Sequence, residues 1–368
     1  MTLAIYFAKR FFISFIRVFL AIGLLVLLFD FITNLNRLNG LESPIKNALS
    51  LSFLRTTTYL SLAMPLIMML SSLTFSVGLA RSNEFIISRA SGLSALKSLL
   101  SVIFTAFMLG IFSIFFLDPI AGKMINSYEQ KLDMLNNAKH PTILINDNGY
   151  WMRQTSLNGN QIIKASSASN NGKILHNLSI FNYNLNGNIV NRIFAKTGFL
   201  KPNEFILTQG VRWTDEKTLS NPKTGSQAFN FFRIPTDITP TQLLEGYAGP
   251  ETISPWNMNK QIIKIKLSGF SILKYESKQK EQYARPFLFI IMILIGCVFT
   301  LKNAKKNNLG LSVVSAVIFG FSLHFFQNFS ITLGRSGEIP LIIATWSPIL
   351  SAGLVTIALF LHLSLIHI

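Results

Sequence analysis

The sequence is poor in cysteine and contains none of the common nucleotide-binding motifs. Its 368 residues include one cysteine, Cys297, which excludes an internal disulfide and a cysteine-based metal cluster. The five histidines lack the HExxH or HxH spacing of a metal site, and neither GxxxxGKS/T nor GxGxxG occurs. We therefore expect no cofactor in this chain and no nucleotide hydrolysis by the chain alone.

Charged residues are scarce as well, and acidic residues most of all. Only 13% of the residues are charged, 50% are apolar and the mean hydropathy is +0.43. A soluble or disordered chain needs more polar surface, so the composition indicates a membrane protein. The 33 Lys and Arg against 16 Asp and Glu give a formal charge of +17. In a membrane protein this excess favours contact with anionic lipid, and we expect no nucleic-acid partner.

Six apolar stretches approach the roughly 20 residues that a helix needs to cross a bilayer core. Three precede a polar middle and three follow it: Phe11 to Leu35, Thr56 to Ala80, Leu96 to Leu117, Pro286 to Leu301, Leu309 to Ile331 and Pro340 to Leu363. The fourth stretch is short, so we expect its helix to begin further upstream. The first is too long for a signal-peptide core and lacks a small-x-small cleavage site, so we expect it to be retained.

The basic residues in the short loops predict the orientation of these spans. If the amino terminus is cytoplasmic, that side receives eight Lys and Arg and one acidic residue, Glu84. The polar middle is then exported. We therefore divide the chain into residues 1–122 with the first three spans, an exported domain of residues 123–253, and residues 254–368 with connecting helices and the last three spans.

The polar middle has the alternating pattern of short strands separated by Asn-Gly turn signals. We expect strands at Tyr150–Arg153, Gln161–Lys164, Lys173–Tyr183 and Phe205–Thr208, with turns near Gly149, Gly159, Gly172 and Gly187. Strands at this spacing form a sandwich, a roll or a barrel. Beyond them, Ser254 and Pro255 predict the start of a helix that ends near Gly269, and a second helix is expected to begin near Ser271 and continue into the fourth span.

The segment between the second and third spans, residues 80–94, reads ARSNEFIISRASGLS. It predicts a short cytoplasmic helix over about residues 81–92, because Ser82 can cap its start, Glu84 suits the helix dipole and Gly92 suits its end. Such a helix can dock on another protein. The segment closely resembles the cytoplasmic coupling segment of the LptF/LptG family, the permease subunits of the lipopolysaccharide transport ABC system.

Other motifs of that family recur in the same order, so the resemblance extends from end to end of the chain. Gly149–Arg153 resembles the Gly-x-Trp-x-Arg run that opens the periplasmic domain of the family. The segment that leads from that domain into the fourth span also resembles the family, at Pro250–Ser254, Gly269, Tyr275 and Pro286. Leu28–Ile32 and Trp346-x-Pro348 are more similar to LptG than to LptF.

The resemblance implies an integral membrane α-helical protein with six transmembrane helices and an inserted periplasmic all-β jellyroll domain. It also implies a location in the inner membrane of a Gram-negative cell. One LptF and one LptG would pair above a dimer of the ATPase LptB, which uses ATP and Mg. The jellyroll edge would join LptC and LptA in a bridge that carries lipopolysaccharide, because an open sheet edge can add a strand.

The resemblance assigns the ATPase contact to the coupling helix, with Glu84 as the central residue and Arg81, Phe85 and Arg89 beside it. The alternative for Glu84 is a first-turn acid that only stabilises the helix dipole, and the alternative for Arg89 is a charge that faces solvent or lipid headgroups. A cationic rim would attract the phosphates of lipopolysaccharide, and the candidates are Arg37, Lys46, Arg55, Lys123 and Lys131. Ordinary lipid-headgroup anchors have the same pattern, so both interpretations stay open.

Four polar residues within or near the spans carry further expectations. Asp30 stands where LptG relatives can have a lysine, and we expect it to pair with a neighbouring base. Asp118, before Pro119, is expected to end the third span. His324 and Gln327 are one turn apart and are expected to form an interhelical hydrogen bond rather than a ligand site.

Two other classes of function remain as alternatives. A membrane enzyme acting on envelope lipids would need carboxylates or histidines facing one cavity, and no spacing in the sequence unites such residues. An envelope scaffold or lipoprotein-sorting component would also suit a β-rich exported domain.

Overall fold

The computed structural model describes most of the chain, which divides into a mainly helical unit and a β unit. The described residues are 2–40, 43–82, 84–90, 95–135, 142–146, 149–156, 159–170, 172–184, 188–201, 203–214, 226–236, 238–240, 243, 249–267, 270–302 and 309–365. The helical unit comprises Met1–Leu132, Glu251–Trp256 and Leu273–Ile368. The β unit comprises Asp133–Pro250 and Asn257–Ile272.

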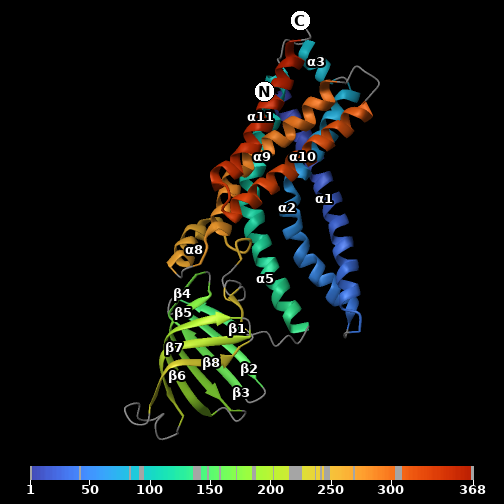
Figure 1. Cartoon of the computed structure of the whole chain (residues 1–368). Coiled ribbons are helices and arrows are strands. Elements are labelled where there is room, and N and C mark those ends of the chain that lie inside the picture. The colour runs from blue at the N-terminus through green and yellow to red at the C-terminus, as the bar shows by residue number, and fades with distance from the viewer. Residues whose placement is uncertain are drawn as a thin grey trace. The chain divides into compact units, whose positions relative to one another are not determined.

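The helical unit is a bundle in which six candidate spans are long and apolar enough to cross a membrane, counted over the described residues. Its elements are α1 (Thr2–Arg37), α2 (Pro44–Arg81), α3 (Glu84–Ala90), α4 (Ala95–Phe112), the π-helix η1 (Ser113–Leu117), α5 (Asp118–Leu135), α9 (Leu273–Lys302), α10 (Leu309–Ser336) and α11 (Leu341–Leu365). These spans confirm the six-helix prediction. The start of α1, the end of α11 and α3 lie at the same end of the bundle (Figure 1).

The helix α9 is the most buried span of the bundle and packs against α2, α4, α10 and α11. It runs without interruption from Leu273 through Pro286, so the fourth span begins upstream as expected. Gly110 of α4 lets this helix approach closely, because a Cβ added there would lie 2.6 Å from the Cα atom of Pro286. Small residues at such crossings allow dense packing between membrane helices.

The expectation that Asp118 ends the third span is wrong. The chain passes through the π-helix η1 directly into α5 and stays helical to Leu135. Pro119 lacks a backbone donor within this continuous helix, and the π-helix directly before it is a common way to absorb such an irregularity. Asp118 itself is buried, so its charge does not require an exit to water.

The coupling segment also differs from its predicted bounds of about residues 81–92. Arg81 is the last residue of α2, and Ser82 is its C-cap, whose backbone N–H bonds to the carbonyl oxygen of Gly78. The Ser82 hydroxyl also donates to Gly78 O, at 3.0 Å. Ser82 therefore closes α2, and the separate helix α3 begins at Glu84; the predicted stop at Gly92 lies outside the described residues.

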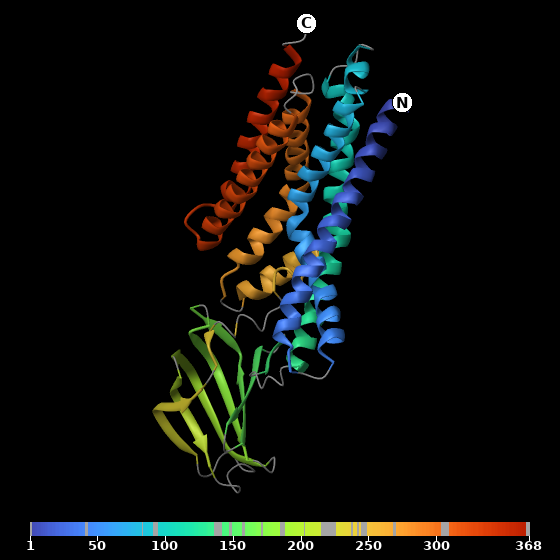
Figure 2. The ribbon, with the colours of Figure 1, turned by 90° about the vertical axis from the view of Figure 1, so that its right-hand side faces the viewer.

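Within the described residues, the β unit is an antiparallel sheet of eight strands, shown with its strands side by side in Figure 2. The strands are β1 (Thr142–Asn146), β2 (Gly149–Ser156), β3 (Gly159–Ala165), β4 (Ser167–Ser169), β5 (Ile174–Tyr183), β6 (Ile189–Lys201), β7 (Glu204–Trp213) and β8 (Gln227–Pro235). Their order is β1-β2-β3-β5-β6-β7-β8, with β4 paired to β5. Three of the four predicted strands fall within β2, β3 and β7, and the fourth matches β5 except that β5 begins one residue later, at Ile174. The strands β1, β4, β6 and β8 were not predicted. The predicted Asn-Gly turn at Gly187 lies outside the described residues.

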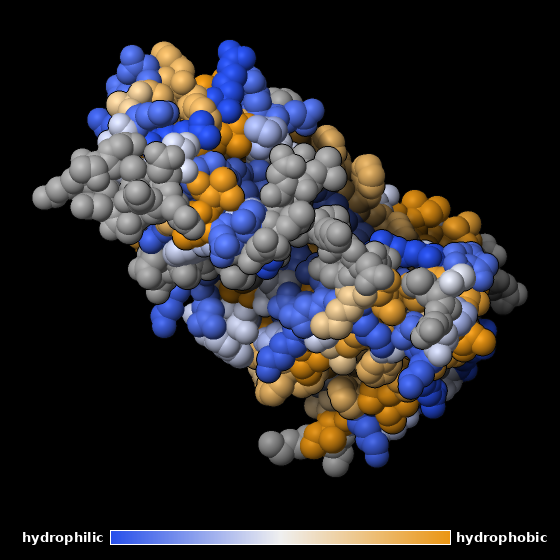
Figure 3. All heavy atoms as spheres, turned by 90° about the horizontal axis from the view of Figure 1, so that it is seen from below, coloured by the Kyte–Doolittle hydropathy of each residue, from blue (hydrophilic) through white to orange (hydrophobic). Residues whose placement is uncertain are grey.

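One face of this sheet holds the apolar core of the β unit. Ile163, Ile180 and Ile193 on successive neighbouring strands are each at most 2% exposed. Phe205 covers Gly198, where an added Cβ would lie 2.8 Å from its ring. The strands alternate because successive side chains point to opposite faces, and the other face carries exposed residues such as Phe199. The surface seen in Figure 3 mixes hydrophilic and hydrophobic residues.

The helix α8 (Pro255–Leu267) follows the strands along the chain. It begins at Pro255, directly after Ser254, as the sequence predicts. Its buried residues are Met258, Ile262 and Ile265, which share one side of the helix. The predicted end at Gly269 lies outside the described residues.

Candidate functional site

A groove of about 670 Å³ opens between α1, α2 and α10. Its lining is mainly apolar, with a few polar side chains, and consists of Val26, Phe29, Asp30, Thr33, Arg55, Tyr59, Leu62, Ala63, Leu66 and His324. An apolar concave surface with few polar groups is the usual form of a site for an amphiphilic ligand. We treat this groove as the candidate substrate site.

Asp30 and Arg55 form the charged part of the groove. The carboxylate of Asp30 lies 3.6 Å from the guanidinium of Arg55, which confirms the expectation that Asp30 pairs with a neighbouring base. Asn34 donates a hydrogen bond of 2.8 Å to Asp30 and holds it in place. The guanidinium of Arg55 also lies over the rings of Tyr59 and Tyr128, at 5.0 and 5.3 Å. Arg55 is thus positioned by one charge and two aromatic rings while 35% of its side chain stays exposed.

The other four cations predicted for the rim do not line this groove. Arg37 at the end of α1, Lys46 in the first turns of α2 and Lys123 on α5 have exposed side chains. Lys131 is half-buried and donates a hydrogen bond of 2.7 Å to the hydroxyl of Ser50. The structure therefore places only Arg55, of the five predicted residues, in the groove.

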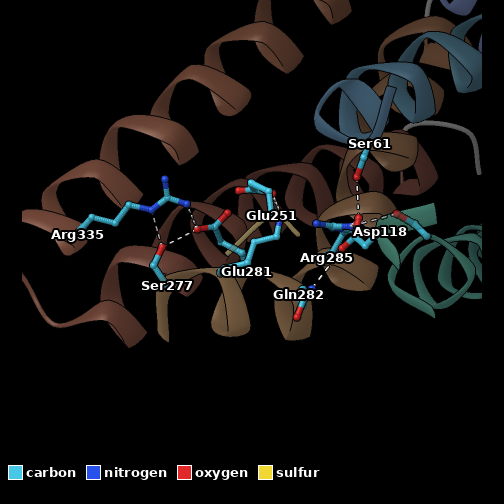
Figure 4. A network of polar contacts seen from close by, with 10 residues as sticks. Ser61, Asp118, Glu251, Ser277, Glu281, Gln282, Arg285 and Arg335 are labelled. Atoms are coloured by element: carbon cyan, nitrogen blue, oxygen red, sulfur yellow. Dashed lines mark hydrogen bonds and ion pairs between the residues drawn. The ribbon is translucent and has the colours of Figure 1, made fainter. Parts of the chain in front are cut away.

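A buried polar network on α9 was not found by the sequence analysis (Figure 4). Arg285 donates to Asp118 at 2.7 Å, and Ser61 of α2 donates to the same carboxylate at 2.7 Å. Further along α9, Glu281 accepts a hydrogen bond of 2.8 Å from Arg335 of α10, and Lys278 pairs with Glu251. The charges at the sequence edges of the apolar stretches were the only signal for this network, and they did not reveal its partners.

Next to the network lies a pocket of about 80 Å³ whose walls are polar and apolar in about equal parts. It shares Leu62 and His324 with the groove. Gln327 donates a hydrogen bond of 3.0 Å to the carbonyl oxygen of Thr345 on α11, which confirms the interhelical bond expected for it. The same expectation is wrong for His324. Its Nε2 lies 3.2 Å from the side-chain amide of Asn328, one turn further along the same helix, so this contact is within α10.

The helix α3 is held against α1 by Glu84, the residue that was predicted to be central to the ATPase contact. Glu84 forms an ion pair with Arg10 of the same chain, and Phe85 is buried in the apolar core of the bundle. Burial raises the pKa of Glu84, but hydrogen bonds from Arg10 and Ser82 outweigh it, so this pKa lies below its ordinary value and the carboxylate is ionised at neutral pH.

The predicted neighbours of Glu84 are placed differently from one another. Arg81 is exposed at the end of α2. Phe85 anchors α3 through its buried ring and does not present a free surface to a partner. Arg89 lies on α3, but its side chain is outside the described part of the chain. The helix thus carries one charged residue, Glu84, whose surroundings are defined.

Together, the six candidate spans and the inserted sheet define a multi-pass membrane protein with a β unit between its third and fourth spans. The chain belongs to the lipopolysaccharide export system permease LptF/LptG family, whose model matches residues 5–362. This match confirms the resemblance inferred from the sequence motifs.

Two curated relatives are LptG proteins. The chain is 24% identical over 291 residues to the lipopolysaccharide export system permease protein LptG of Escherichia coli strain K12, and the alignment covers 78% of this chain and 77% of that protein. LptG of Escherichia coli O6:H1 (strain CFT073) has the same identity and coverage. Both relatives agree with the expected LptG-like character. The family is a class of transport permeases and not of enzymes, which argues against the envelope-lipid enzyme considered from the sequence.

Proposed function

We propose that this chain is a permease subunit that extracts lipopolysaccharide from the outer leaflet of the inner membrane, while a separate ATPase chain of the LptB type hydrolyses ATP. The observation that carries the proposal is the groove between α1, α2 and α10. Its walls suit acyl chains, and Arg55 offers a guanidinium that can bind a phosphate. A lipid with phosphates on its head group presents both of these features.

The ion pair with Asp30 sets how strongly the groove can hold such a lipid. Arg55 keeps N–H groups beyond the pair for a phosphate, since its planar fork has five donors. Asp30 is buried and anionic, so it repels the same phosphate and favours later release. The groove therefore combines attraction with a built-in limit on affinity, which suits a transporter that must let its substrate go.

The helix α3 provides a mechanical link between an ATPase and the groove. Its Glu84 is paired with Arg10 on α1, and α1 also supplies Phe29 and Asp30 to the groove wall. A straight helix of 20 residues covers about 30 Å, so displacement of α3 at one end of α1 can be transmitted to the groove. ATP-driven closure of an LptB dimer would pull α3, shift α1 and narrow the groove.

Further partners follow from the same proposal. A sister permease of the LptF or LptG type would complete the cavity against the exposed faces of α1 and α10. Arg37, Lys46, Lys123 and Lys131 remain candidates for the cationic rim at the periplasmic side. The outer strands β1 and β8 each have one neighbouring strand among the described residues, so either edge can accept a strand of LptC or LptA.

The groove is tested by photocrosslinking from Phe29, which lines it. A photoreactive phenylalanine at this position is expected to label lipopolysaccharide in membranes that contain the whole transporter, and ATP should reduce the labelling. The matched control is the same substitution at Leu350 of α11, which is 59% exposed and does not line the groove. Equal labelling at both positions would remove the groove from the transport route.

The coupling role is tested by charge reversal at Glu84. We expect Glu84→Lys to lower copurification of the ATPase and ATP-dependent lipid release by about tenfold or more. The reason is that the proposed contact between Glu84 and a basic residue of the ATPase becomes repulsive. Glu338→Lys makes the same charge change at an exposed site beyond the end of α10 and should leave both quantities unchanged. If Glu84→Lys behaves like this control, the ATPase does not act through α3.

A further inference from the structure

The helix α8 has two apolar sides, of which only one is covered. Met258, Ile262 and Ile265 are buried on the first side. Trp256, Ile263 and Leu267 are 56%, 59% and 81% exposed, and their spacing of seven and four residues places them together on the opposite side. A helix that only supported the β unit would carry polar residues there.

The charges of α8 have one sign. Lys260, Lys264 and Lys266 lie on the helix, and its 13 residues include no Asp or Glu. At 3.6 residues per turn, Lys260 and Lys264 flank the exposed stripe on one side and Lys266 on the other. Apolar residues with a tryptophan, bordered by lysines, are the composition of a helix that lies in the headgroup layer of an anionic membrane.

The start of α8 is tied to a membrane span. Trp256 belongs to the helical unit and stacks on Phe115 of η1, with ring centroids 5.5 Å apart. Phe115 lies within the candidate span that begins at Ser98, and its neighbour Phe116 is 57% exposed. Tryptophan and other aromatic side chains gather where the hydrocarbon meets the headgroups. Trp256, the first residue of the exposed stripe, thus stacks on an aromatic residue of a candidate membrane span.

We propose that α8 is an interfacial helix whose exposed side, formed by Trp256, Ile263 and Leu267 with the flanking lysines, binds anionic phospholipid headgroups of the outer leaflet. The charge complementarity and the continuity with the aromatic surface of η1 identify lipid as the occupant. Each lysine near an anionic surface contributes attraction, and the apolar stripe adds to it. This inference depends on the chain spanning a membrane and not on which lipid the permease exports.

The test places an environment-sensitive fluorophore on Ile263→Cys in the full-length chain in nanodiscs, with native Cys297 buried and out of reach. In nanodiscs with about one third phosphatidylglycerol we expect a blue-shifted emission and strong quenching by a lipid that carries a nitroxide at the headgroup. Lys201→Cys, on the exposed face of β6, is the control and should be quenched by aqueous iodide and not by the lipid.

A second variant separates lipid contact from other ways of covering α8. Lys260→Glu with Lys266→Glu is expected to shift the equilibrium between the lipid-bound and water-exposed states by about tenfold or more, which lowers lipid quenching of the fluorophore at position 263 and raises iodide quenching. A probe shielded from both iodide and the lipid nitroxide would show that protein covers α8 and would overturn the proposal. Equal iodide quenching at positions 263 and 201 would overturn it as well.

Discussion

Arg285→Met is expected to lower the free energy of unfolding of the helical unit by about 3–5 kcal/mol. The guanidinium of Arg285 is the ion-pair partner of Asp118, at 2.7 Å, and the two side chains are 12% and 6% exposed. Methionine fills a similar volume but leaves the carboxylate buried with only neutral hydrogen-bond donors. The charge of Lys278, which also acts on Asp118, is already paired with Glu251. A buried charge without its partner costs more free energy than the pair gains when it forms. Removing one partner of the pair is therefore strongly destabilising.

The remaining contacts of Asp118 do not replace the lost charge. Ser61 donates at 2.7 Å, and the amide of Gln282 lies at 3.3 Å. A double variant, Asp118→Asn with Arg285→Met, removes both charges and should recover much of the stability, which would show that the penalty comes from the unpaired carboxylate. The measurement is thermal or denaturant unfolding of the purified chain in one fixed detergent, followed through the helical signal.

The matched control for this prediction is Arg335→Met. Arg335 also pairs with a carboxylate of α9, that of Glu281 at 2.8 Å, but the two side chains are 37% and 22% exposed. Pairs with such access to water contribute about 0–1 kcal/mol. If Arg285→Met costs no more than Arg335→Met, burial of the Asp118 pair does not determine its contribution to stability.

Phe205→Ala is expected to destabilise the β unit by about 3–5 kcal/mol. Phe205 is 1% exposed, and its ring lies directly over Gly198 on the neighbouring strand β6. Removing the ring leaves a cavity that the sheet cannot close, because strand pairing holds β6 and β7 at a set distance. Hydrogen-exchange protection of the amides in β5, β6 and β7, measured in the full chain, reports the change in the β unit itself.

Phe199→Ala supplies the comparison, since Phe199 lies on the same strand pair but is 40% exposed. Its loss should cost about 1 kcal/mol or less. Comparable loss of amide protection in the two variants would mean that the face bearing Phe205 is not the core of the β unit.

The spans were predictable because membrane crossing depends on the length and polarity of a local stretch. The strands were predictable in part for a similar reason. β5 lies beside an Asn-Gly signal, whereas β8 contains the adjacent pair Phe231 and Phe232 and has no such signal directly before it. The sequence placed the end of the third span at Pro119, because proline usually interrupts a helix. The helix continues because the π-helix before Pro119 absorbs the irregularity.

The residues of the candidate sites were likewise predictable only in part. Asp30 and Arg55 are 25 positions apart on successive helices, and the expectation that Asp30 would find a base was confirmed. Asp118 and Arg285 are separated by 167 positions, and Arg10 and Glu84 by 74. Pairs at these distances carry no local pattern, so their partners could not be named in advance.

What the amino-acid order alone determined was the membrane class of the protein, its six spans with a β-rich insert, and its membership of a permease family, because each of these depends on local hydrophobicity or on short motifs. The tertiary structure alone decided which charges are paired, that α9 carries the buried network, and that α1, α2 and α10 enclose a groove. The physical reason is that burial and ion pairing depend on helix packing, which brings together residues that are remote along the chain.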